Sequence, residues 1–179
     1  MDKTVCYNTV AIWKAGNVVA ITIMVSACLL GLPTDYQGST KNQSDYLISI
    51  AKQFNVVPFC PEQLGGLPTP RIPSEIEAGD AAGTWCGHRC VRRQDGEDVT
   101  AEFKRGAEIT LAIARLVNPR MFVMKDRSPS CGVNLVYDGS FSHIQVSGVG
   151  LATFRLLEFG YKVCSGEDAS VQIDTLIKE

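Results

Sequence analysis

The sequence predicts an α/β fold in which a mostly parallel sheet is flanked by helices, and three observations support this prediction. Short apolar segments alternate along the chain with longer segments of helical periodicity. Several of the short segments are continuous runs rich in Val and Ile, as parallel strands buried on both faces usually are. At 179 residues, the chain has the length of a single domain with one buried core.

Two strands and a helix are expected in the first half of this domain. Residues 21–27 are apolar and form the first predicted strand. Residues 44–54 place apolar side chains on one face, which predicts a helix. The short apolar segment 55–60 is predicted to be the second strand. A strand–helix–strand order of this kind is typical of parallel neighbours in a sheet.

The clearest helical pattern lies in the middle of the chain. Over residues 99–116, apolar side chains recur at spacings of four, four and three, and Asp98 can serve as the N-cap. The dipeptide at 118–119, Asn-Pro, ends this helix. Residues 121–125 then form a third buried strand.

A hairpin, a helix and a last strand are predicted towards the C-terminus. Asp138-Gly139 lies between two β-prone segments and predicts a turn between antiparallel strands. A helix over residues 149–159 ends at Gly160, and residues 161–164 form a final strand. The whole alternation predicts a three-layer, Rossmann-like domain with helices on both faces of the sheet.

We expect residues 21–179 to form this single α/β domain and residues 1–20 to be an N-terminal extension. Seven cysteines form an odd number without the regular spacing of a disulfide scaffold, which favours a reducing compartment and hence a cytoplasmic protein. A formal net charge of −2 gives no electrostatic reason to expect a nucleic acid partner. No apolar run reaches the roughly 18 residues that span a bilayer, so no membrane association is expected.

The segment VSACLLG, residues 25–31, leaves the role of Cys28 open between three interpretations. The apolar run before Cys28 and the letters VSAC resemble the lipidation signal of an exported lipoprotein. However, the apolar character continues past Cys28 into LLGLP, where a mature lipoprotein normally turns polar. We therefore favour a buried strand end, at which Cys28 is either a packed thiol or a metal ligand.

Three cysteines follow three predicted strands. Cys28 closes the first strand, Cys60 closes the second, and Cys131 lies in the loop after the third. Because the carboxyl ends of parallel strands meet at one edge of the sheet, these loops are expected to form one ligand site. Thiolates favour zinc and iron–sulfur clusters, and three protein ligands would leave one coordination position open for a substrate.

At these residues the sequence resembles the family once catalogued as domain of unknown function 523, whose characterised members are TudS-like thiouracil desulfidases. The shared motifs run from about residue 24 to residue 163 and are VSACLLG, CPEQLGGLPTPR, DVTAEFKRGAE, KDRSPSCG and YDGSF. The resemblance implies a [4Fe-4S] cluster bound by Cys28, Cys60 and Cys131. In that family the unique iron takes the sulfur of a thiolated uracil, and water replaces this sulfur at carbon without net redox chemistry.

Five residues beside the predicted ligands fit such a reaction. Glu62 could activate water or protonate the substrate ring, or else bond to loop amides. Ser128 and Ser130 stand before Cys131, and the resemblance implies that one of them is catalytic; the alternative is that they cap the following turn. Arg71 and Lys125 are candidates for binding the pyrimidine, and both could instead be structural ion-pair partners.

Two features depart from the family pattern or stand outside it. Asp35 occupies the first position of DYQG, where the family commonly has RYDG, which leaves the preferred thiolated compound open. Cys86, His88 and Cys90 have an unusual spacing for a zinc site and lack a second pair of ligands. A free base, a nucleoside and a modified RNA all stay open as substrates, and a non-catalytic zinc- or cluster-binding module is the alternative function.

Overall fold

The computed structural model describes residues 21–178, in which four parallel strands form the central sheet in the order β2-β1-β5-β8. These strands are β1 (Thr22–Ser26), β2 (Asn55–Phe59), β5 (Met121–Met124) and β8 (Val163–Ser165). β1 lies between β2 and β5, so its backbone is paired on both sides. The predicted parallel sheet is confirmed.

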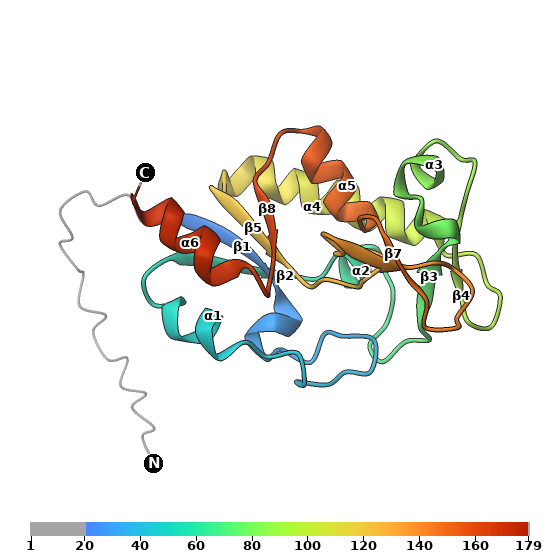
Figure 1. Cartoon of the computed structure of the whole chain (residues 1–179), viewed down its shortest axis with the longest axis horizontal. Coiled ribbons are helices and arrows are strands. Elements are labelled where there is room, and N and C mark those ends of the chain that lie inside the picture. The colour runs from blue at the N-terminus through green and yellow to red at the C-terminus, as the bar shows by residue number, and fades with distance from the viewer. Residues whose placement is uncertain (1–20, 179) are drawn as a thin grey trace, which may run out of the picture.

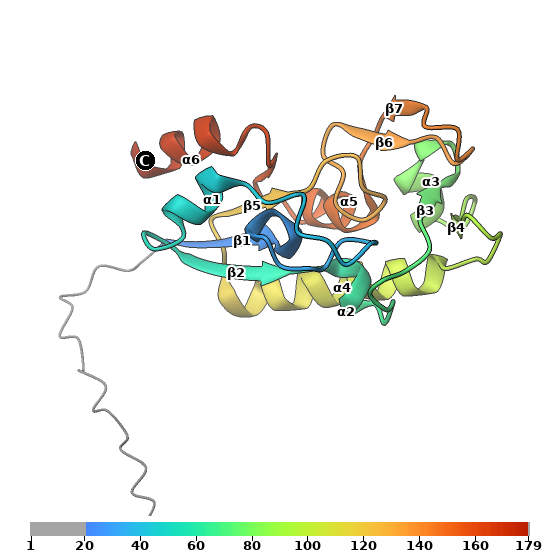
Figure 2. The ribbon, with the colours of Figure 1, turned by 90° about the horizontal axis from the view of Figure 1, so that it is seen from below.

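Helices cover both faces of this sheet, as the alternating pattern predicted (Figure 1). α1 (Asp45–Ile50) and α6 (Ala169–Lys178) pack on one face, against the side chains of Ile23 and Val25 among others. α4 (Thr100–Val117) and α5 (Leu151–Glu158) pack on the other. Figure 2 shows α1 and α6 on one side of the sheet and α4 on the other.

Most of the predicted elements are present with boundaries shifted by a few residues. The helix expected over residues 44–54 ends at Ile50, with Ser44 as its N-cap accepting the N–H of Leu47. Asp98 accepts the N–H of Thr100 at 2.9 Å, although Val99 is the N-cap position of α4. The sequence missed α6, whose polar residues obscure its apolar side.

The smaller elements surround the carboxyl ends of the central strands and were mostly not predicted. They form two antiparallel two-stranded sheets and several short helical turns. They are η1 (Ala27–Leu30), α2 (Pro61–Leu64), β3 (Ser74–Ile76), η2 (Glu77–Gly79), α3 (Ala81–Trp85), β4 (Val91–Arg93), β6 (Leu135–Tyr137) and β7 (Gln145–Ser147).

The predicted hairpin exists as β6 and β7, but its connection is longer than a tight turn at Asp138-Gly139. The strands pair Tyr137 with Gln145, which leaves residues 138–144 as a seven-residue loop. A side-chain carboxylate from β3 accepts hydrogen bonds from two amides of this loop. The sequence therefore predicted the antiparallel hairpin correctly, but it predicted too short a connection between the two strands.

The second strand is followed by a helix–helix contact in which two backbones touch. A Cβ added at Gly106 of α4 would lie 2.0 Å from the carbonyl oxygen of Pro61. A Cβ added at Gly65 would lie 2.1 Å from the carbonyl oxygen of Glu102. Only glycine allows this approach, which fixes α2, and with it Cys60 and Glu62, against the long helix.

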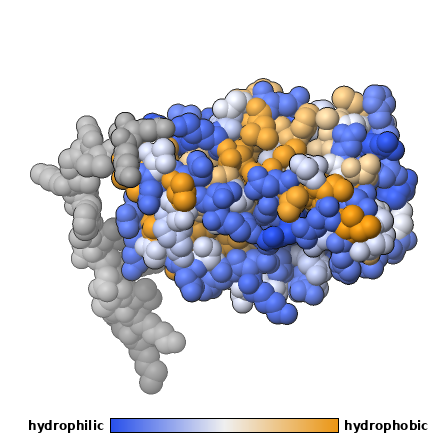
Figure 3. Space-filling view, viewed as in Figure 1, coloured by the Kyte–Doolittle hydropathy of each residue, from blue (hydrophilic) through white to orange (hydrophobic). Residues whose placement is uncertain are grey.

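The face shown in Figure 3 mixes hydrophilic side chains with smaller hydrophobic groups. Among residues 21–178, no helix is long and apolar enough to cross a membrane.

Candidate functional site

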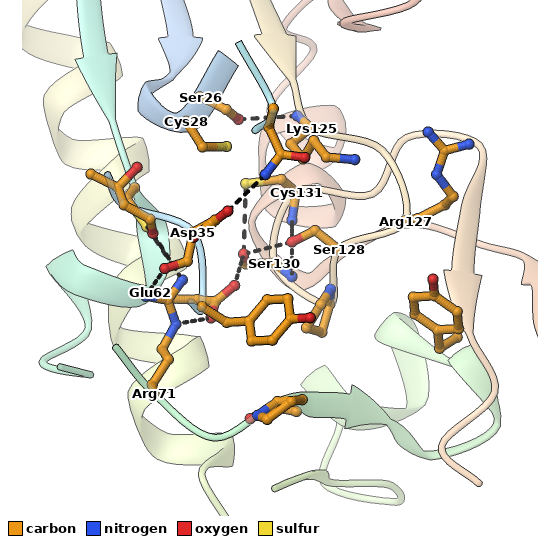
Figure 4. Close-up of a pocket in the computed structure, with 18 of the residues that line it drawn as sticks. Ser26, Cys28, Asp35, Glu62, Arg71, Lys125, Arg127, Ser128, Ser130 and Cys131 are labelled. Carbon is orange, nitrogen blue, oxygen red and sulfur yellow. Dashed lines mark hydrogen bonds and ion pairs between the residues drawn. The ribbon is translucent and has the colours of Figure 1, made fainter. Parts of the chain in front are cut away.

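A pocket of about 340 Å³ opens where β1, β2 and β5 end. This volume lies in the range of small-molecule sites, about 300–1,000 Å³. Cys28, Cys60 and Cys131 all line it, and so do the five polar residues that the sequence analysis placed beside them, which are Glu62, Arg71, Lys125, Ser128 and Ser130. The predicted meeting of distant segments at one sheet edge is therefore observed (Figure 4).

Each of the three cysteines is held by a short, well-defined backbone feature. Cys28 lies in η1, the single turn that follows β1. Cys60 is the N-cap of α2, whose first residue is Pro61. Cys131 follows β5 in a loop and is 5% exposed, while Cys28 is 9% exposed. All three thiols are free.

The three thiols are close enough to influence one another's ionisation. Burial, followed by the charge of Cys60, raises the pKa of Cys28 to about 11. Burial and then Cys60 raise the pKa of Cys131 to about 12, and Cys28 contributes in the same direction. Burial, with Glu62 next, also raises the pKa of Cys60. Two buried thiols and the half-buried Cys60, which repel each other as thiolates, form a site that favours a bound cation.

The spacing of these thiols bears on which metal group they could hold. Within the described part of the chain, no three His, Cys, Asp or Glu side chains form a group that could hold a metal ion. A single zinc ion would require all three sulfurs at about 2.3 Å from one centre. An iron–sulfur cluster instead separates its cysteine ligands by its own width. The three thiols around one pocket are of the donor type that holds iron–sulfur clusters and zinc.

Glu62 is one of the buried carboxylates that line the pocket. It is 9% exposed and accepts a hydrogen bond from Nε of Arg71 at 2.6 Å. Its other oxygen accepts the Oγ–H of Ser130 at 2.8 Å. Figure 4 shows Glu62 between these two side chains. Since each carboxylate oxygen can accept two hydrogen bonds, both oxygens keep a free lone pair.

Arg71 joins the loop after β1 to the start of α2. Besides Glu62, its guanidinium donates to the carbonyl oxygens of Thr34, at 3.1 Å, and Asp35, at 3.4 Å. Burial opposes its charge, but Glu62, together with Cys60 and Cys131, outweighs burial and raises the pKa of the guanidinium. The structure therefore shows Arg71 as an ion-pair partner, the alternative that the sequence left open. Its role in binding a substrate stays a prediction.

The carboxylate of Asp35 forms its hydrogen bonds within its own loop. Its carboxylate accepts hydrogen bonds from the backbone of Gln37 and Ser39 and from the side chain of Asn42. Although burial opposes its charge, these hydrogen bonds lower its pKa, those from Ser39 most. Asp35 thus stabilises the loop that Arg71 contacts, and it lines the pocket with an anionic group where the family commonly has a cation.

The two serines before Cys131 have different environments. Ser128 Oγ accepts the backbone N–H of Cys131 at 3.1 Å, so it caps the turn that carries the cysteine. Ser130 Oγ, in contrast, bonds Glu62 and lies 3.6 Å from the sulfur of Cys131. The two hydroxyl oxygens are 3.1 Å apart. Of the two, Ser130 is the one in contact with both an acid–base group and a predicted ligand.

Lys125 lies at the end of β5 beside the thiols. Its backbone N–H donates to Ser26 Oγ at 3.1 Å, and its Nζ donates to the carbonyl oxygen of Asp126 at 3.1 Å. The coulombic effect of Lys125 favours the thiolate of Cys28. Its placement suits either a cation that balances thiolates or a contact to the substrate.

Asp126 is a site residue that the sequence analysis missed. Its Oδ1 accepts the N–H groups of Val133, at 2.8 Å, and Asn134, at 3.0 Å, and that of Leu135. Although burial opposes its charge, these amides lower its pKa. Asp126 closes the loop that contains Ser128, Ser130 and Cys131. Its position just after a buried strand was the signal that could have identified it.

The remaining cysteines lie outside this pocket. Cys164 is buried, with its sulfur 3.7 Å from that of Met121. Cys86 is exposed and Cys90 is partly buried, and neither lines the pocket. Cys6 lies outside the described residues. A lipid on Cys28 would require cleavage before it and hence the loss of β1, which is paired on both sides in the central sheet, so the structure disfavours that interpretation.

Comparison with known proteins agrees with the resemblance seen in the motifs. The sequence model of the 2-thiouracil desulfurase family matches residues 23–168. The Bacillus subtilis (strain 168) protein YbbK, itself uncharacterized, is 38% identical over 143 residues, which are 80% of this chain and 94% of YbbK. A solved structure of the [4Fe-4S]-dependent thiouracil desulfidase TudS (DUF523Vcz) is similar with a TM-score of 0.78 and 36% identity. That match covers 89% of this chain and 99% of the solved one.

Proposed function

Because the chain belongs to the 2-thiouracil desulfurase family, an enzyme family, we propose that it removes sulfur from thiouracil or a related thiolated pyrimidine. The proposed reaction replaces C=S by C=O: one water is consumed, its oxygen becomes the carbonyl oxygen, and sulfide leaves with both protons as H₂S. No electrons are transferred. The observation that carries this proposal is the set of three mutually interacting thiols in one pocket beside Glu62.

We propose that Cys28, Cys60 and Cys131 hold a [4Fe-4S] cluster. The donor set fits, because all three are thiols at a pocket and no protein side chain supplies a fourth ligand in the predicted set. When bound, such a cluster would offer one iron as a Lewis acid for the sulfur of the substrate. Zinc is the less favoured occupant, because the similar solved structure is described as a [4Fe-4S]-dependent enzyme.

In this proposal Glu62 is the general acid–base group of the reaction. Its free lone pairs can accept a proton from water beside the C=S carbon, and the same carboxyl can return it to the leaving sulfur or the ring. Arg71 holds the carboxylate in one orientation through the 2.6 Å contact. Ser130 donates a hydrogen bond to Glu62 and lies near Cys131, so it keeps the carboxylate of Glu62 next to the proposed metal ligands.

The proposed substrate is a small molecule rather than a membrane or a nucleic acid. The pocket volume of about 340 Å³ suits a single pyrimidine with a modest substituent. Lys125 is proposed to orient the oxygen of the ring or to balance charge at the thiolates. We propose a cytoplasmic location because a cluster with an open iron would need a reducing environment.

An anaerobic sulfide-release assay tests this function. The chain is purified without oxygen, reconstituted with iron and sulfide, and incubated with 2-thiouracil and with 4-thiouracil. We expect one sulfide and one uracil for each substrate consumed, with the new oxygen derived from labelled water. A reconstituted protein that binds a cluster but releases no sulfide from any thiolated pyrimidine would instead point to a non-catalytic binding module.

A further inference from the structure

The pocket has an aromatic wall that the roles described above do not use. Tyr137, Phe141 and His143 line it, and all three come from the β6–β7 hairpin. Tyr137 and His143 pack edge to face, with ring centres 6.4 Å apart. We refer to residues 138–144, the connection between β6 and β7, as the aromatic loop. The roles proposed above for the thiols and for Glu62 do not involve this loop.

The hairpin packs closely against β3 and η2, and glycines stand at the points of contact. A Cβ added at Gly79 would lie 2.6 Å from Cγ2 of Val146. A Cβ added at Gly139 would lie 2.9 Å from both Cα of Glu77 and the carbonyl oxygen of Ile76. Figures 1 and 2 both show the hairpin beside β3, at the end of the molecule away from α6. The base of the aromatic loop is therefore fixed against β3.

Glu75, in the middle of β3, holds the loop itself. Its Oε2 accepts the backbone N–H of Gly139 and the backbone N–H of Phe141, both at 3.0 Å. Glu75 is 9% exposed and lines the pocket. A carboxylate that accepts hydrogen bonds from two amides of one loop holds that loop firmly, because hydrogen bonds to a charged acceptor are stronger than neutral ones. We refer to these two hydrogen bonds of Glu75 as the clamp.

The clamp stabilises a backbone conformation that the loop would not adopt freely. Phe141 has a φ of 57° and His143 a φ of 61°, and both lie in the left-handed region, which costs energy for residues with a side chain. One of the two amides bound by Glu75 belongs to Phe141 itself. Strained residues of this kind persist where surrounding contacts determine them, and they occur most often at functional sites.

We propose that Glu75 is a positioning residue that holds Phe141 in the pocket wall, where its ring stacks against the ring of the substrate. This inference rests on the proposed function, since it assigns the aromatic wall to a thiolated pyrimidine. Stacking of a nucleobase on an aromatic side chain contributes substantially to binding and tolerates changes in ring substituents. Glu75 acts through Phe141 and does not touch the reacting atoms.

Three substitutions and one matched control test this role. Glu75→Ala removes the clamp, Glu75→Gln keeps an oxygen that can accept both amides, and Phe141→Ala removes the ring while leaving the clamp. Glu77→Ala is the control, because Glu77 is two residues away and also accepts a backbone N–H, at 3.3 Å, but from Cys90 outside the loop. Each full-length protein is reconstituted anaerobically and compared by cluster absorbance, KM and kcat for the better thiouracil isomer.

We expect E75A and F141A to raise KM about tenfold while kcat changes less than about threefold, with E75Q and E77A close to the wild type. Cluster absorbance is expected to be the same in all five proteins. Unchanged KM in F141A, or a loss in E75Q as large as that in E75A, overturns the proposal. If E75A does not fold, the proposal still requires a raised KM in F141A and a wild-type KM in E75Q, and failure of either overturns it.

Amide hydrogen exchange supplies a readout that does not depend on activity. The N–H groups of Gly139 and Phe141 are expected to lose at least tenfold in protection in E75A and to keep it in E75Q and E77A. If the wild type releases no sulfide, the proposed function fails while this exchange result still tests the clamp. If the wild type is active and protection in E75A is unchanged, the inference fails alone.

Discussion

Replacing Glu62 by Gln is expected to separate sulfide release from cluster binding. The substitution preserves the size of the side chain but removes its charge and one of its two acceptor oxygens. In the wild type those oxygens accept from Ser130 at 2.8 Å and from Arg71 at 2.6 Å. The variant can turn its oxygen towards Arg71 and its NH₂ group towards the hydroxyl oxygen of Ser130, which can accept, so both contacts can persist while the ion pair with Arg71 is lost.

The size of both effects follows from these contacts. The buried guanidinium of Arg71 loses its anionic partner, and hydrogen bonds to charged groups contribute about 1.5–3 kcal/mol, so we expect the free energy of unfolding to fall by about 2 kcal/mol. An amide cannot carry a proton between water and the leaving sulfur, and loss of a general acid–base lowers the rate by about 10²–10⁴-fold. We expect a decrease in kcat within that range. The three cysteines are untouched, so iron content stays that of the wild type.

The assay is anaerobic sulfide release, with iron content and urea unfolding measured on the same preparations. Glu77→Gln is the control, because it makes the same chemical change at a carboxylate whose side chain is 43% exposed. If E62Q retains its cluster and releases sulfide within about threefold of the wild-type rate, Glu62 does not transfer protons and the proposed mechanism is wrong.

Three further predictions concern the loops and helix that carry the site. Ser130→Ala should lower kcat by more than about tenfold with the cluster retained, because Ser130 contacts Glu62. Ser128→Ala should mainly lower iron uptake, because Ser128 caps the turn of Cys131. Equal effects of the two substitutions on kcat would contradict this division of roles. Gly106→Ala should lower the free energy of unfolding by about 1–3 kcal/mol and reduce iron content, because its Cβ would press on the carbonyl of Pro61; urea unfolding showing wild-type stability would argue against the close contact. Asp126 has a pKa below its usual value when folded, so it contributes stability above pH ~4 that is lost as the pH falls further. Asp126→Asn should therefore lose less stability than the wild type between pH 6 and pH 3, and parallel losses in the two proteins would refute this origin of the acid sensitivity.

The sequence predicted the central sheet because its strands follow a simple rule. β1 and β5 are buried on both faces and read as continuous apolar runs, and the long apolar periodicity of α4 is equally clear. Positions at the carboxyl ends of these strands then predicted that Cys28, Cys60 and Cys131 would share a pocket, which the structure confirms. Their role as cluster ligands stays a prediction.

The elements that the sequence did not predict lack such a local signal. β3 has three residues and pairs with β4, so its stability comes from tertiary contacts rather than from its own pattern. Glu75 accepts hydrogen bonds from backbone amides that lie far from it along the chain. Asp126 accepts them from a nearby loop, whose conformation cannot be predicted from its composition. The partner of Arg71 was equally hidden, since an ion pair between residues nine apart has no sequence signature.

Iron content of anaerobically purified protein tests the central claim, that three thiols from three strand ends hold one cluster, most directly. The account predicts about four irons per chain in the wild type and in Cys86→Ser, whose thiol is exposed and away from the pocket. It predicts a large loss of iron and of the brown colour in Cys28→Ser, Cys60→Ser and Cys131→Ser. A wild type that stays colourless and free of iron after reconstitution, or a serine variant of any of these three that keeps its full iron, would contradict the account.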